Sequence, residues 1–149
     1  MKLTLEDILE MWSVDCVIDQ FNLDDQSRKT PSLHAKYLEI YAVTKLKLKR
    51  AELEQKVLLK EKYLYYNGKL PEETIKERGW EFDPFDGLRI LKGDMEYYYN
   101  ADTDIQRSEE KVTYIKTILE TLEEVINNLK WRHTTIKNML DYKKWESGG

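Results

Sequence analysis

The side chains with the clearest chemical potential in this 149-residue chain are lysines near its middle, which suggest binding to phosphate groups. From Lys36 to Lys69 the chain has nine basic and four acidic residues, a local charge of +5, although its net charge is −4. On a helix with about 100° per residue, four lysines share an arc of roughly 60°: Lys45, Lys49, Lys56 and Lys60. Such an arc would neutralise phosphates and release counterions from a nucleic acid.

Tyrosines follow directly after the last of these lysines. The stretch KEKYLYYNGK contains Lys62 and three aromatic rings, those of Tyr63, Tyr65 and Tyr66. Aromatic rings stack on unpaired bases of any sequence, so lysines next to tyrosines indicate single-stranded nucleic acid. A lysine face that is only solvated, with tyrosines that only pack, would explain the same residues.

The sequence suggests neither a catalytic nor a metal site. His34 and His133 are far apart, and Cys16 is the one cysteine, which falls short of the ligand sets that hold zinc. None of the six glycines belongs to a phosphate-binding loop. Asp83 and Asp86 lack the spacing of a calcium loop. We therefore expect no enzyme and no cofactor.

Helical patterns cover most of the chain and predict an all-α fold. Thr4 can cap a short helix over Leu5 to Trp12, and a second short segment is expected over Val14 to Phe21.

The next helix should be long. Residues 22–31 are expected to form a loop because Asp, Ser, Thr and Pro gather there. Ser32 can cap a helix that runs from Leu33 to Tyr66, and Gly68 is a suitable stop. A helix of this length needs a packing partner.

Residues 69–100 are expected to form an irregular connector. Pro71 can open a short helix that ends near Gly79. The loop over residues 79–87 carries three aromatic residues, which could cover the apolar edge of a helical bundle: Trp80, Phe82 and Phe85. The run Tyr97 to Tyr99 suggests packing or contact between subunits.

The segment from Asp102 to Trp145 has a heptad pattern. Over five heptads, positions a and d are apolar except for Ser108 and His133, which is typical of a coiled coil. The apolar members are Ile105, Val112, Ile115, Leu119, Leu122, Ile126, Leu129, Ile136 and Leu140. Ile118, Val125 and Met139 widen this stripe, which favours a bundle or a higher homo-oligomer over a dimer. We expect this helix to drive oligomerisation.

The length predicts one helical domain over residues 1–149. The lysine and heptad patterns divide it into N-terminal helices over 5–68, expected to bind DNA, and an oligomerisation helix over 102–145. The single cysteine and the acidic residues near the N-terminus indicate an intracellular protein.

Three stretches resemble the UvsY family, the recombination mediator proteins of T-even-like bacteriophages. They are LTLED from Leu3, the step Val17-Ile18-Asp19 and, above all, QKVLLKEKYLYYNG from Gln55. The last one matches the family's motif of Lys, one residue, a basic residue and then Tyr-Tyr-x-Gly.

The resemblance implies a mediator that binds single-stranded DNA and assembles into rings of six or seven subunits in the cytoplasm of the infected bacterial host. It further implies contacts with the phage RecA-like recombinase and with the phage single-strand-binding protein, which the recombinase replaces. The family's DNA contacts carry over to Lys60 and Lys62. Lys62 stands where the family typically has Arg, so the charge is kept and the forked guanidinium is lost.

Two alternatives fit the same sequence. A structural coiled-coil adaptor or scaffold protein would assemble in the same way without binding nucleic acid. A chaperone-like module would instead contact its partner through Trp80, Phe82 and Phe85.

Overall fold

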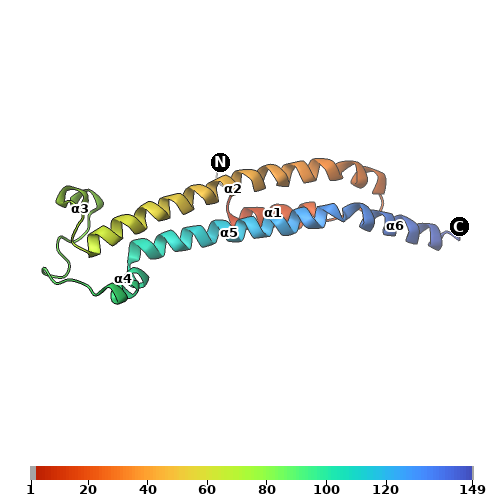
Figure 1. Ribbon diagram of the computed structural model, residues 1–149. Coiled ribbons are helices and arrows are strands. Elements are labelled where there is room, and N and C mark those ends of the chain that lie inside the picture. Colours follow the sequence, from red (N-terminus) through yellow and green to blue (C-terminus); the bar gives the residue numbers. More distant parts are fainter. Residues whose placement is uncertain (1–2, 149) are drawn as a thin grey trace. The chain divides into compact units, whose positions relative to one another are not determined.

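The computed structural model describes residues 3–148, and every regular element in that range is helical (Figure 1). The elements in chain order are α1 (Leu5–Asp15), α2 (Leu23–Tyr66), α3 (Glu72–Arg78), the 3-10 helix η1 (Lys92–Asp94), α4 (Met95–Ala101), α5 (Thr103–Lys130) and α6 (Arg132–Glu146). The predicted all-α fold is confirmed. No helix in the described range is long and apolar enough to cross a membrane.

The chain forms two compact units, each of which includes part of α2 and part of α5. The first unit contains the residues up to Leu46 and those from Ile115 onward, and the second contains Lys47–Tyr114. Helices α1 and α6 therefore belong to the first unit, whereas α3, η1 and α4 belong to the second.

The core of the first unit joins residues of α1, α2 and α5. Its buried members are Ile8, Tyr37, Ile118, Leu122, Val125 and Leu129. The fully buried ring of Tyr37 packs edge-on against Trp12, with the ring centroids 5.5 Å apart. Burial of these apolar side chains is the main stabilising contribution to this unit.

Helix α1 begins where the sequence predicts. The Asp7 N–H donates to Thr4 Oγ1 at 3.1 Å, and the Thr4 N–H donates to Asp7 Oδ2 at 2.9 Å. This capping box satisfies two amide groups that have no partner inside the helix. The helix runs beyond the predicted Trp12 to Asp15, whose carboxylate accepts hydrogen bonds from Lys36 and Tyr37, both at 2.7 Å. Burial acts to raise the pKa of Asp15, but these hydrogen bonds outweigh it and leave the pKa below its ordinary value.

The segment between α1 and α2 differs from the sequence prediction. Residues 16–22 are not helical, so the short helix predicted over 14–21 does not form. Helix α2 begins at Leu23, well before the predicted start at Leu33, and it passes through Pro31. Residues 22–31 are therefore helical almost throughout, and Ser32 is not the cap.

Contacts made by the first turns of α2 explain this difference. Leu23 is buried, and Gln26 Oε1 accepts a hydrogen bond from Arg132 Nη2 at 3.0 Å. Exposed ion pairs four residues apart add a few tenths of a kcal/mol each: Asp24–Arg28 and Asp25–Lys29, both at 3.0 Å. These contacts favour the early helical start and act against the loss of a backbone hydrogen bond at Pro31.

The connector is partly helical, because it contains α3, η1 and α4. Helix α3 confirms the predicted short helix: Pro71 lies at its N-cap, and Gly79 ends it with a φ of 72°. A positive φ of this size favours glycine, since it has no Cβ. The aromatic loop over residues 79–87 contains no helix. The run Tyr97 to Tyr99 lies in α4.

The C-terminal helical stretch is divided at Trp131, whereas the heptad pattern predicts an unbroken helix over 102–145. Neither Gly nor Pro marks this break in the sequence. Arg132 opens α6 and is buried, and its guanidinium donates to the backbone oxygen of Asp15 at 3.2 Å as well as to Gln26.

The predicted heptad seam is largely enclosed within one copy of the chain. Five of its residues are buried: Ile105, Val112, Leu122, Leu129 and Ile136. Three more are partly buried, namely Ile115, Leu119 and Ile126, and Leu140 is 43% exposed. Ile118 and Val125, which lie outside the a and d positions, are also buried. The stripe therefore serves the fold of the chain itself, and only its less buried members are open to solvent.

This division predicts different effects for two seam leucines. Leu122→Ala should lower the free energy of unfolding by about 2–5 kcal/mol, because it leaves a cavity in the core of the first unit. Leu140→Ala, the matched control at an exposed position, should lower it by less than about 1 kcal/mol. Urea denaturation measures both values. Equal losses in the two variants would contradict the assignment of Leu122 to the core.

Candidate nucleic-acid interface

Exposed lysines form a stripe on the part of α2 that belongs to the second unit. Lys49, Lys56 and Lys60 share one face of the helix and are all exposed, and we call them the basic stripe. In the part of the chain that the structure describes, none of the three forms an ion pair. Lys45 is also exposed, but it belongs to the first unit. Unpaired ammonium groups in solvent are available to phosphates.

Tyr63 extends the basic stripe by one turn, since it follows Lys60 by three residues on the same face. Its side chain is 49% exposed. Of the three tyrosines predicted to stack on bases, it is the one whose ring is substantially open to solvent.

Tyr65 and Tyr66 pack against the aromatic loop and α4. Tyr65 is 7% exposed, and its hydroxyl donates to the backbone oxygen of Glu81 at 2.5 Å. The Tyr66 hydroxyl donates to Asp102 Oδ2. The Tyr66 ring contacts a ring from the loop and two from α4, at centroid distances of 5.8, 5.9 and 6.4 Å: Phe85, Tyr98 and Tyr99. Packing is therefore the role that this geometry gives to both tyrosines.

Lys62 is enclosed by acidic and aromatic side chains. Its side chain is 4% exposed, and its Nζ lies 2.9 Å from Asp102 Oδ2 and 2.9 Å from Asp104 Oδ2. The same ammonium lies 3.8 Å from the centroid of a Trp80 ring, a cation–π contact. We call Lys62, Tyr66, Trp80, Asp102 and Asp104 the Lys62 cluster.

Asp102 is the acceptor at the centre of this cluster. Burial acts to raise its pKa, but hydrogen bonds from Tyr66, from the Ile105 N–H and from Lys62 outweigh that effect and lower the pKa below its ordinary value. Burial, followed by the bond to Asp102, raises the pKa of Tyr66. Through Asp102 Oδ1 the cluster also caps α5, because this oxygen accepts from the Ile105 N–H at 3.0 Å.

This geometry separates two residues that the resemblance groups as DNA contacts. Lys60 is exposed, whereas the Lys62 ammonium already has two carboxylate partners and almost no access to solvent. In this arrangement Lys62 cannot reach a phosphate, and its contacts are those of a residue that positions the connector. The sequence gives one hint of this, since Lys62 lies off the lysine arc. Its partners lie far along the chain.

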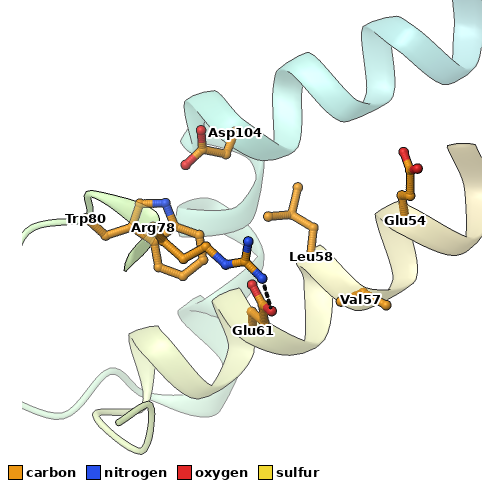
Figure 2. Close-up of a pocket in the computed structure, with 7 residues that line it drawn as sticks. All are labelled: Glu54, Val57, Leu58, Glu61, Arg78, Trp80 and Asp104. Atoms are coloured by element: carbon orange, nitrogen blue, oxygen red, sulfur yellow. Dashed lines mark hydrogen bonds and ion pairs between the residues drawn. The ribbon is translucent and has the colours of Figure 1, made fainter. Parts of the chain in front are cut away.

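A groove beside the basic stripe marks the limit of any phosphate-binding surface (Figure 2). It is lined by three carboxylate residues, one arginine and three apolar residues: Glu54, Glu61, Asp104, Arg78, Val57, Leu58 and Trp80. Arg78 Nη2 bonds to Glu61 Oε1 at 2.6 Å, and Lys111 Nζ lies 3.4 Å from Glu54. Paired cations and lining carboxylates make this groove a poor site for an anionic strand.

Residues considered for metal binding lie apart from this surface. Among the described residues, no group of three or more His, Cys, Asp and Glu side chains could hold a metal ion. Cys16 and His133 are exposed, and His34 is partly buried.

Comparisons with known proteins converge on one family. The chain matches the model of the family described as recombination, repair and ssDNA binding protein UvsY over residues 11–149. It is 28% identical to the recombination protein uvsY of Enterobacteria phage T4 over 144 aligned residues. The alignment covers 97% of this chain and 98% of that relative.

Solved structures agree with this match. The chain is similar to the crystal structure of the bacteriophage T4 recombination mediator protein UvsY in lattice type II, with a TM-score of 0.82 and 27% identity over 98% of this chain and 99% of that chain. The crystal structure of the same protein in lattice type I gives a TM-score of 0.81 and 26% identity. That comparison covers 94% of this chain and 98% of that chain.

The two lysines should differ sharply in their contribution to stability. Lys62→Met should lower the free energy of unfolding by about 3–5 kcal/mol, because it leaves the buried carboxylate of Asp102 without its cation. Lys60→Met, the matched control two residues away, should change it by less than about 0.5 kcal/mol. Urea denaturation followed by circular dichroism measures both values. A Lys62→Met variant as stable as the control would show that the cluster does not hold the second unit together.

Proposed function

Because the chain belongs to the UvsY family of recombination, repair and single-stranded-DNA-binding proteins, we propose that it is a recombination mediator that holds single-stranded DNA on the basic stripe. The observation that carries this proposal is the set of exposed, unpaired ammonium groups of Lys49, Lys56 and Lys60, which ends at the half-exposed ring of Tyr63. Lys45, in the first unit, supplies a further exposed cation.

The chemistry of the basic stripe suits transient, sequence-independent binding. Lysine ammonium groups contact phosphates as point charges and read no bases. One ring per copy adds a stacking platform that accepts any base. With so few contacts a single copy binds weakly, and the net charge of −4 adds no general attraction for DNA. Weak, salt-sensitive binding is what a protein requires if it transfers the strand to another protein.

Assembly would raise the affinity for the strand by multiplying these contacts. We propose a ring-like homo-oligomer of six or seven subunits, in which the less buried seam residues Leu119, Ile126 and Leu140 contact a neighbouring copy. Linked copies bind one strand at high effective concentration. The chain contributes binding and positioning in this role, with no catalytic step.

In the same proposal the protein acts with two partners in the cytoplasm of the infected host. It helps a phage RecA-like recombinase to take the place of the phage single-strand-binding protein on the strand. Contacts with both proteins belong to this proposal, which rests on the family membership.

The salt dependence of strand binding tests the basic stripe. Each phosphate contact on a single strand contributes about 0.7 to the slope of log K against log salt. The double variant Lys56→Ala/Lys60→Ala should therefore lose about 1.4 from the wild-type slope. Fluorescence anisotropy of a labelled oligo-dT strand at several salt concentrations measures this slope.

Lys116→Ala is the matched control, since Lys116 is an exposed lysine of α5 outside the stripe, and it should keep the wild-type slope. A double variant with the wild-type slope would exclude the stripe as the phosphate contact. If the wild-type protein binds no oligo-dT at low salt, the structural adaptor becomes the better account.

A further inference from the structure

A pocket of about 370 Å³ lies at the C-terminal end of α2, and all the residues that line it belong to the second unit. Its lining includes four aromatic side chains: Tyr65, Tyr66, Phe82 and Phe85. The volume falls within the range of about 300–1,000 Å³ that is typical of sites for small ligands. The pocket is therefore large enough to hold one planar group.

The line of the basic stripe leads to this pocket. On a helix with about 100° per residue, four residues lie within an arc of roughly 60°: Lys56, Lys60, Tyr63 and Asn67. Asn67 follows the last residue of α2, and its N–H donates to the Tyr63 backbone oxygen at 3.2 Å, as in an α-helix. Asn67 also lines the pocket. A strand that follows the basic stripe beyond Tyr63 therefore reaches the pocket.

One of the four rings is open to solvent. Phe82 is 63% exposed, whereas Tyr65 is 7% exposed. The hydroxyls of Tyr65 and Tyr66 are bound to Glu81 and Asp102, as described above. Phe82 is thus the ring on which a base can stack while the two tyrosines keep their packing.

Two charged side chains line the pocket, those of Arg89 and Asp83. Arg89 is exposed and forms no ion pair in the described part of the chain. Asp83 Oδ1 accepts from the Gly87 N–H at 2.9 Å, and a carboxylate has room for further donors. A nucleotide matches both groups, because its phosphate is anionic and the edge of its base carries N–H donors.

An apolar side chain of a partner protein would match these groups less well. It would cover Arg89 and Asp83 without supplying partners for them, and charged groups that lose water without gaining a partner are costly. In a duplex the bases are stacked and paired, so they cannot enter a pocket unless they leave the stack. The ligand that fits is therefore an unpaired nucleotide.

We propose that this pocket holds one base of single-stranded DNA where the strand leaves the basic stripe. The base stacks on Phe82 and donates to Asp83, and a neighbouring phosphate contacts Arg89. This proposal rests on the proposed function and adds a base contact to a surface that otherwise binds mainly the backbone.

Binding of two labelled strands tests the base contact: oligo-dT and an abasic strand of the same length. Phe82→Leu removes the ring but keeps an apolar side chain at an exposed position. Fluorescence anisotropy should show that it binds oligo-dT at least about fivefold more weakly than wild type does, with unchanged affinity for the abasic strand. The control Phe82→Tyr keeps a ring and should bind both strands as wild type does.

The salt dependence of oligo-dT binding tests the phosphate contact. Arg89→Gln should lower the slope of log K against log salt by about 0.7. Lys92→Gln is the matched control, since Lys92 is an exposed cation three residues away that does not line the pocket, and it should keep the wild-type slope. An Arg89→Gln variant with the wild-type slope would exclude Arg89 as a phosphate contact.

The two strands also separate the failure of this proposal from that of the proposed function. If Phe82→Leu binds both strands as wild type does, the pocket holds no base, while the proposed function stands. Equal weakening for both strands would assign Phe82 to the fold or to a contact between proteins, and it would also overturn the pocket. If wild type binds no oligo-dT, both proposals fail.

Discussion

The second unit depends on one buried ammonium group. The side chain of Lys62 is 4% exposed; Asp102 and Asp104 each approach its ammonium at 2.9 Å, and the Trp80 indole covers it at 3.8 Å. These partners come from the aromatic loop and the start of α5, whereas Lys62 itself lies near the end of α2. Since leaving any of them unpaired is costly, the ion cluster fixes how the connector packs on the end of α2.

This constraint also explains how one short stretch of sequence can serve both structure and binding. From Lys60 to Tyr66, side chains on successive faces of α2 meet different surroundings. Lys60 and Tyr63 meet solvent, whereas Lys62, Tyr65 and Tyr66 meet the connector. The buried residues pack the segment against the connector, and the exposed ones form the proposed contact with a strand. The presence of a charged residue in a binding motif therefore does not establish that its side chain contacts the ligand.

Elements with local determinants could be predicted from the sequence, and those with distant ones could not. The start of α1 follows from Thr4 and Asp7 alone, and the ends of α3 follow from Pro71 and Gly79. The early start of α2 is supported in part by a hydrogen bond between Gln26 and Arg132, which are 106 residues apart. Helical periodicity was enough to place the exposed lysines on one face. It could not show that Asp102 would pair with Lys62, and it could not divide the heptad seam between the core of one copy and contacts among copies.

Lysine acetylation read by mass spectrometry, with and without oligo-dT, tests most directly whether strand contact and structural support are divided in this way. In the free protein, Lys49, Lys56 and Lys60 should react readily, and Lys62 should remain unmodified because its ammonium is buried and ion-paired. Adding the strand should protect the three exposed lysines and leave Lys62 unchanged. A Lys62 that reacts in the free protein and becomes protected by DNA would contradict the account.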